Sequence, residues 1–176
     1  KYRWFLTSNK HVVVGGKNAE QNEELLKHFK ENKKYLVMHT IAPGSPFSII
    51  IASNPSEGDL EETAIFTACF SQAWKSNKKE VIIDVFLVEQ IVKKKEMKTG
   101  TFGVLGPVDR KKVFLKLYST KQKEVLRFVP FKTKGISIKQ GKMDKEKFSE
   151  MLSKKIKISK EEIMQALPSW GFELCN

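Results

Sequence analysis

The sequence is poor in the residues that mark secreted, membrane and metal-binding proteins. Its two cysteines, Cys69 and Cys175, are too few for a disulfide framework or a zinc site, and Cys69 lies in an apolar helical pattern that predicts burial. No apolar run approaches the roughly 20 residues of a membrane span. The first residues do not follow a signal-peptide pattern. These absences predict an intracellular, cytoplasmic protein with no membrane partner.

Catalytic and nucleotide-binding motifs are missing as well. The sequence has no Gly-x-Gly-x-x-Gly or Walker loop, no serine nucleophile elbow and no cluster of metal ligands. Its three histidines are scattered: we interpret His11 as structural and His28 as solvated. His39 ends an apolar run beside a Pro-Gly loop, where it is either a satisfied, partly buried imidazole or a contact to a phosphate or base. We therefore predict no enzyme activity, no cofactor and no metal.

Positive charge, in contrast, is abundant and concentrated in one part of the chain. The net charge is +12, and residues 110–160 carry 17 Lys or Arg against 4 acids, whereas the other residues nearly balance. Such segregation favours a basic face that binds a phosphate backbone. The alternative is that the lysines reflect a generally lysine-rich composition and form only a solvated surface. An anionic membrane could also attract this charge, but the sequence contains no basic amphipathic helix with bulky apolar anchors.

Local patterns predict an α+β fold, with a mixed or antiparallel sheet and helices packed on it over residues 1–130. Residues 4–6 and 12–14 flank a polar turn and predict a hairpin. Asn18 and Ser56 are predicted helix caps, the second with Asp59 as a capping box. The predicted helices are residues 19–30 and 60–76, and the other predicted strands are 35–40, 47–52, 80–88, 99–107, 113–118 and 124–130, with 119–123 as a hairpin turn.

The composition of the sequence changes after Pro130. Residues 131–142 are basic and poor in core residues, and Asp144 and Ser159 each begin a helical pattern. We predict a small, basic, helical extension over residues 131–176, which could serve as a protein-docking appendage. Trp170 and Phe172 near the chain end are expected to dock against the rest of the protein.

Two features stand out as candidate sites. Gly15-Gly16 connects a strand to the helix start at Asn18, where free N–H groups can hold an anion, although a tight connection alone is the commoner reason for such a pair. Asp84 interrupts an apolar strand, and since a buried carboxylate needs a partner we predict that it pairs with Lys or Arg.

Several sequence blocks resemble those of a known family. Residues 15–23, Gly-Gly-Lys-Asn-Ala-Glu-Gln-Asn-Glu, resemble the Gly-Gly-Arg-Asp-Ala-x-x-Asn-Glu signature of the NFACT-R domain, the RNA-binding domain of the NFACT ribosome quality-control proteins. Other blocks follow in the family's order: Arg3-Trp4-Phe5, His39, residues 69–74, residues 99–102 and residues 111–115. Among the departures, Lys17-Asn18 replaces Arg-Asp, a second histidine is missing after His39, and residues 107–110 are interposed. Residues from 131 onward match nothing in the family, and the chain resembles a stand-alone version without the family's other domains.

The resemblance implies a non-catalytic module that binds structured RNA, tRNA or ribosomal RNA, with the ribosome as a possible partner in translation quality control. Alternatives are an accessory subunit of a tRNA-modifying enzyme, for example in thiolation, and an unrecognised nucleic-acid enzyme such as a nuclease. Each candidate RNA contact also has a plainer role as a solvated or capping residue. The candidate contacts are Arg3, Gly15, Gly16, Lys17, Asn18, Asn22, His39, Thr99, Arg110, Lys111, Lys112, Lys116 and Arg127, the later ones on a basic ribbon formed by two strands with Lys121 and Lys123.

Overall fold

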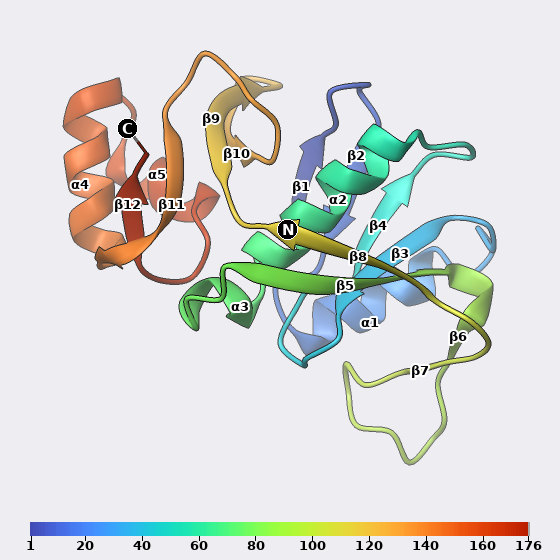
Figure 1. Cartoon of the computed structure of the whole chain (residues 1–176). Helices are drawn as coiled ribbons and strands as arrows, with labels where there is room; N and C mark the ends of the chain where they lie inside the picture. The colour runs from blue at the N-terminus through green and yellow to red at the C-terminus, as the bar shows by residue number, and fades with distance from the viewer. Residues whose placement is uncertain (176) are drawn as a thin grey trace.

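A computed structural model describes residues 1–175 and has an α+β fold (Figure 1). In this part of the chain the sheets are all antiparallel and contain six, four and two strands. The predicted fold class is therefore confirmed. The elements in chain order are β1 (Arg3–Leu6), β2 (Val12–Gly15), α1 (Ala19–His28), β3 (Leu36–Thr40), β4 (Ser48–Ile51), α2 (Glu57–Cys69), α3 (Gln72–Lys75), β5 (Glu80–Leu87), the 3-10 turn η1 (Val88–Gln90), β6 (Ile91–Val92), β7 (Gly103–Val104), β8 (Asp109–Phe114), β9 (Leu117–Gln122), β10 (Val125–Val129), β11 (Ser137–Met143), α4 (Lys145–Ile156), α5 (Lys160–Ala166) and β12 (Phe172–Leu174).

The six-stranded sheet has the order β1-β2-β4-β3-β5-β8, and helices cover both of its faces. Side chains alternate between the faces of a strand, so neighbouring residues of β3 enter different cores. Val37 belongs to the cluster that contains Leu25 and Leu26 of α1. Met38 belongs to the cluster that contains Cys69 of α2, which is buried as predicted. The apolar strand β4 lies inside the sheet between β2 and β3, as its sequence predicted.

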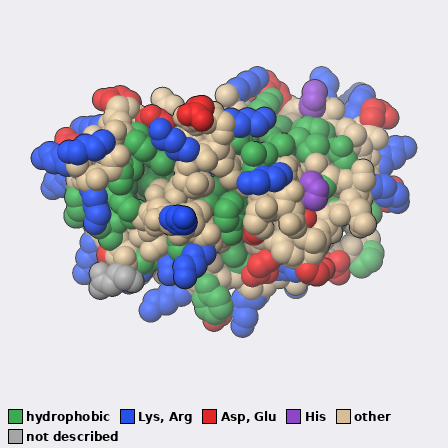
Figure 2. Space-filling model, turned by 90° about the horizontal axis from the view of Figure 1, so that it is seen from above, with side chains coloured by type: hydrophobic (Ala, Val, Ile, Leu, Met, Phe, Trp, Pro, Cys, Tyr) green, Lys and Arg blue, Asp and Glu red, His purple; other side chains and the backbone are tan. Residues whose placement is uncertain are grey.

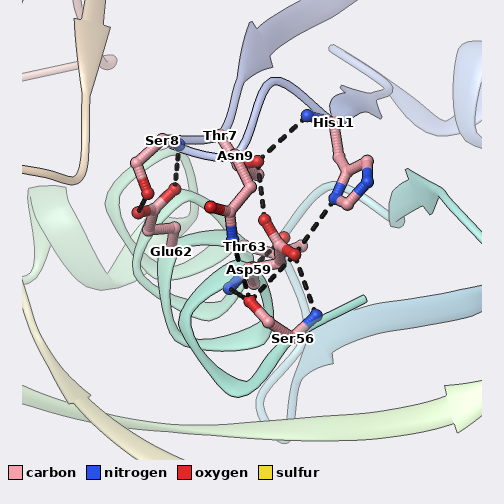
Figure 3. A network of polar contacts seen from close by, with 8 residues as sticks. All are labelled: Thr7, Ser8, Asn9, His11, Ser56, Asp59, Glu62 and Thr63. Carbon is pink, nitrogen blue, oxygen red and sulfur yellow. Dashed lines mark hydrogen bonds and ion pairs between the residues drawn. The ribbon is translucent and has the colours of Figure 1, made fainter. Parts of the chain in front are cut away.

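A buried polar network fastens the β1–β2 hairpin to the start of α2 (Figure 3). The hairpin itself and the capping box of Ser56 and Asp59 are both confirmed. The Asp59 side chain is fully buried. Its Oδ1 accepts a hydrogen bond from Thr7 Oγ1 at 2.7 Å, and its Oδ2 accepts one from Ser56 N at 2.8 Å. His11 Nδ1 lies 3.0 Å from the same Oδ2. The network fixes the orientation of β1, the strand that carries Arg3.

The four-stranded sheet, of order β10-β9-β11-β12, lies beside the first sheet with α4 and α5 (Figure 1). Both helices begin at the predicted caps, Asp144 and Ser159. Residues 131–176 are nevertheless not purely helical, because they also supply β11 and β12. The strand pattern of β11 is hard to see because Ile138 is its one fully buried residue. Since β11 pairs with β9, the boundary predicted at residue 130 falls within this sheet.

Trp74 of α3 joins this second sheet to the rest of the protein. Its Nε1 donates a hydrogen bond to Gly171 O at 2.9 Å, and its ring lies 5.9 Å from that of Phe172. Phe172 also stacks on Phe148 of α4 at 5.1 Å. The predicted docking is thus confirmed for Phe172, but it is wrong for Trp170, which is 48% exposed.

The helix predicted over residues 60–76 is interrupted. It ends at Cys69, and the short α3 starts after Ser71, whose hydroxyl accepts a hydrogen bond from Ala73 N. The Gln72 amide donates to Gly44 O at 2.8 Å rather than continuing the helical ladder. The break brings Phe70 and Ser71 against the β3–β4 loop, where they help to line a cleft.

The strand boundaries after residue 98 also differ from the prediction. In the glycine-rich stretch 99–107, only β7 is a strand. The strand predicted at 113–118 is divided between β8 of the first sheet and β9 of the second. The turn predicted at 119–123 is a two-residue turn at Lys123 and Glu124, both with positive φ. The predicted basic ribbon is therefore split: Arg110, Lys111 and Lys112 lie on β8 in the first sheet, whereas Lys121 on β9 and Arg127 on β10 lie in the second.

Candidate functional site

A cleft of about 580 Å³ opens where four connections of the first sheet meet. The connections are the β2–α1 turn, the β3–β4 loop, the break between α2 and α3, and the loop before β7. Six of the predicted contact residues line this cleft, so the fold brings together positions up to 36 residues apart: Arg3, Gly16, Lys17, Asn18, Asn22 and His39.

Close packing explains the second glycine of the pair. A Cβ on Gly16 would lie 2.2 Å from Asn22 Oδ1 and 2.7 Å from Asn22 N, which no side chain permits. Asn22 is buried and accepts a hydrogen bond from Phe47 N at 3.1 Å. Asn22 therefore ties the start of α1 to the β3–β4 loop, and we assign it a positioning role in the cleft.

The first turn of α1 presents backbone donors to the cleft. Asn18 caps the helix by accepting a hydrogen bond from Gln21 N, as predicted, and Gln21 Oε1 accepts one from Lys17 N. Within the described residues, the N–H groups of Ala19 and Glu20 have no hydrogen-bond partner. Unpaired amides at a helix start carry partial positive charge and can bind an anion.

Aromatic rings form one wall of the cleft. His39 lies at 4.5 Å from Phe47 with a 32° tilt, and Phe102 meets Phe47 edge-on at 5.3 Å. Burial lowers the pKa of His39, against opposing effects of the Thr40 carbonyl and Asp84, which favours the neutral ring. Since His39 Nδ1 contacts the Thr40 carbonyl, which can only accept, the neutral ring leaves Nε2 as a hydrogen-bond acceptor. Such a ring can stack on a base or accept from a hydroxyl.

Arg3 and Lys17 supply the positive charge of the cleft. The Arg3 guanidinium lies 4.6 Å from the centre of the Phe70 ring. Burial, together with the nearby Arg127, lowers the pKa of Arg3 to about 10. Burial followed by the charges of Arg3 and Arg127 also lowers the pKa of Lys17. Both groups stay cationic at neutral pH, and neither forms an ion pair within residues 1–175.

The cations predicted on the basic ribbon lie elsewhere, and several are neutralised. The three cations of β8 form ion pairs with acids from the first half of the chain: Arg110 with Asp84 at 3.1 Å, Lys111 with Glu57 at 3.0 Å and Lys112 with Glu80 at 3.6 Å. The first of these pairs confirms the prediction for Asp84. Figure 2 shows Lys and Arg side chains around much of the outline of one face, with Asp and Glu among them. Three of the cations in the basic segment 110–160 are therefore neutralised by acids from outside that segment.

The remaining candidates lie around the cleft rather than in it. Gly15 is buried behind it, where a Cβ would meet Pro46 at 3.2 Å. Thr99 is exposed and precedes Gly100, which does line the cleft. Lys116 lies over Tyr118 at 5.4 Å in the second sheet. Arg127 lies on β10 next to Arg3, outside the cleft.

Sequence reasoning missed the aromatic lining of the cleft. Phe47, Phe70 and Phe102 each occur in apolar runs that look like core. The Pro-Gly loop before Phe47 and the glycines around Phe102 were the available signals, since loop residues are more often functional than core residues. Among residues 1–175 no group of His, Cys, Asp or Glu is arranged to hold a metal ion. No helix in the same range is long and apolar enough to cross a membrane.

Comparisons with known proteins agree with the sequence blocks. A family model described as NFACT protein RNA binding domain matches residues 1–106. The archaeal Rqc2 homolog aRqcH of Methanocaldococcus jannaschii is 34% identical over 114 residues, which cover 60% of this chain and 16% of that protein. The ribosome quality control complex subunit NEMF homolog of Drosophila melanogaster is 28% identical over 111 residues, which cover 60% of this chain and 11% of that protein. The chain thus spans less than a fifth of the length of either relative.

A solved structure shares the fold. The C-terminal part of the fibronectin/fibrinogen-binding protein from Streptococcus suis aligns with a TM-score of 0.59 at 23% identity. The alignment covers 65% of this chain and 45% of that one. The family match ends before β8, so it includes every residue that lines the cleft except Ser169, but neither Arg127 nor the second sheet.

Proposed function

The chain belongs to the NFACT protein RNA binding domain family, and from that premise we propose that it binds structured RNA, either tRNA or ribosomal RNA, in the cleft at the start of α1. The proposed role is recognition without catalysis. The observation that carries the proposal is that one cleft combines cations, unpaired helix amides and partly buried aromatic rings.

Each part of the cleft matches a part of RNA. Arg3, Lys17 and the first amides of α1 suit phosphate oxygens. The rings of His39 and Phe102 suit an unstacked base, and His39 Nε2 suits a 2′-hydroxyl donor. Double-helical regions would be held by their shape and phosphates, which is how structured RNA is generally recognised.

The relatives connect the proposal to translation. The Drosophila relative is named as a subunit of the ribosome quality control complex, so we propose that the RNA is met on or near the ribosome, in the cytoplasm. A tRNA-modifying enzyme as partner stays a prediction of the sequence, since neither relative's name points to one.

Salt titration of tRNA binding tests the proposal. With about four phosphates neutralised, the affinity for a tRNA transcript should fall roughly a hundredfold between 50 and 200 mM salt. Fluorescence anisotropy with tRNA, a ribosomal RNA hairpin and an unstructured RNA of equal length measures both the affinity and the preference for structure. No binding, or binding that salt does not weaken, would contradict the proposal.

A histidine pair provides the matched control for the cleft. His39→Ala removes a ring that stacks in the cleft and should weaken RNA binding by about tenfold, the cost of one lost stacking contact. His28→Ala removes an exposed ring at the far end of α1 and should leave the affinity unchanged. Equal effects of the two substitutions would place the RNA outside the cleft.

A further inference from the structure

Four cations converge next to the cleft from separate parts of the chain. Arg3 comes from β1, Lys17 from the β2–α1 turn, Arg127 from β10 and Lys145 from the first residue of α4. Arg3, Lys17 and Arg127 line a second, smaller cavity of about 170 Å³. Lys145 Nζ donates a hydrogen bond to Leu167 O at 3.3 Å, beside Ala166, which lines the same cavity. Burial, together with the charges of Arg3 and Lys17, lowers the pKa of Lys145 to about 8. We call these four residues the cation cluster.

The cation cluster has no counter-ion of its own. None of its members forms an ion pair within residues 1–175, whereas Arg110, Lys111 and Lys112 of β8 each pair with an acid. Arg127 Nε is buried and has no hydrogen-bond partner in the described chain. Burial lowers the pKa of Arg127, and the charge of Glu162 opposes this with a smaller effect. The Glu162 carboxylate, however, accepts a hydrogen bond from Leu126 N at 3.0 Å and forms no ion pair with Arg127. Like charges gathered without an ion-paired acid repel one another, so the arrangement favours the binding of an external anion.

Aromatic rings hold the two arginines in place. The Arg127 guanidinium lies 4.1 Å from the centre of the Trp4 ring, and Arg3 lies similarly over Phe70. A stacked guanidinium keeps its edge free, and that planar edge matches two oxygens of a phosphate. Arg3 and Lys17 line both the small cavity and the cleft, so an RNA strand could pass from one to the other.

From this geometry we propose that the cation cluster binds a phosphate group of the RNA, and that Arg127 and Lys145 extend the RNA site beyond the family-matched residues 1–106. The inference rests on the proposed function. It gives the C-terminal part of the chain a direct role in RNA binding, through Lys145, in place of a separate docking role.

Substitution of Lys145 is the sharpest test on RNA. Lys145→Met keeps most of the apolar stem and should weaken tRNA binding about three- to tenfold, with a salt slope smaller by about one. Lys155→Met removes an exposed lysine from the same helix and should change neither quantity. Unchanged tRNA binding in Lys145→Met, while the wild-type protein binds tRNA, would overturn this inference and leave the proposed function standing.

A second measurement does not depend on RNA. Because Arg127 lies over Trp4, the indole N–H signal of Trp4, assigned by its loss in Trp4→Phe, should shift when inorganic phosphate is titrated. Arg127→Gln should abolish the shift, and Arg127→Lys should weaken it; thermal unfolding checks that both variants fold. If the wild-type protein fails to bind tRNA, the proposed function fails, and a phosphate shift that Arg127→Gln abolishes still supports the phosphate site. No shift with phosphate, or a shift with polyglutamate alone, would overturn it in favour of an empty site or an acidic protein partner.

Discussion

Gly16→Ala is expected to lower the free energy of unfolding by about 1–3 kcal/mol, the usual cost of forcing extra atoms into a packed site. The added Cβ would lie 2.2 Å from Asn22 Oδ1 and 2.7 Å from the Asn22 backbone N. A side chain can rotate away, but the backbone of α1 has to move. Because Lys17 and the first amides of α1 move with it, tRNA affinity should fall by tenfold or more. Urea unfolding and tRNA anisotropy measure the two effects.

Gly58→Ala is the matched control for this substitution. Gly58 lies in the first turn of α2. A Cβ added to Gly58 would lie 3.6 Å from Ser56 Oγ, which is an ordinary van der Waals contact. Alanine is the better helix former, so this variant should be more stable by up to about 1 kcal/mol and should bind tRNA normally. Gly16→Ala should cost less when it is made in an Asn22→Ala protein than in the wild type, since one of the two clashes disappears. A Gly16→Ala protein as stable as wild type would contradict the close packing described here.

Gly16 also illustrates how far the sequence leads. The glycine pair between a strand and a capped helix predicted a tight connection, with an anion-binding turn as the alternative, because both signals are local. The reason that alanine does not fit is not local, since it depends on Asn22 being held by Phe47 from another loop. Among the predicted contacts, those near Gly16 and His39 meet in one cleft, whereas those on β8 lie apart from it.

The errors in the predicted fold have similar physical causes. Lys123 and Glu124 form a tight turn with φ values of 50° and 63°, although neither residue type favours positive φ, so no turn signal was present. Strand β11 is stabilised by pairing with β9 and β12, which are distant in sequence, and it buries only one of its seven residues fully. The pairing of the β8 cations with distant acids was likewise invisible, so the predicted basic ribbon was overestimated.

Asp59→Ala is expected to cost about 3–5 kcal/mol, the range for breaking a buried charged network from one side. The substitution leaves the Thr7 hydroxyl and the Ser56 amide without their acceptor and releases the hairpin that carries Arg3 (Figure 3). Asp144→Ala removes an aspartate that caps α4 at a more exposed position, and it should cost only about 1 kcal/mol. Urea unfolding at pH 7 measures both losses. Equal losses would show that Asp59 acts as an ordinary helix cap.

The stability that the Asp59 network contributes should depend on pH. Burial would raise the pKa of Asp59, but hydrogen bonds from Thr7, Ser56 and His11 outweigh burial and hold this pKa well below its usual range. A carboxylate with a lowered folded-state pKa stabilises the fold above its unfolded pKa of about 3.9, and that contribution is lost as the pH falls further. The stability difference between wild type and Asp59→Ala should therefore be constant from pH 7 to about pH 5 and shrink below about pH 4. A difference that stays constant down to pH 3 would mean that the network does not depend on the charge of Asp59.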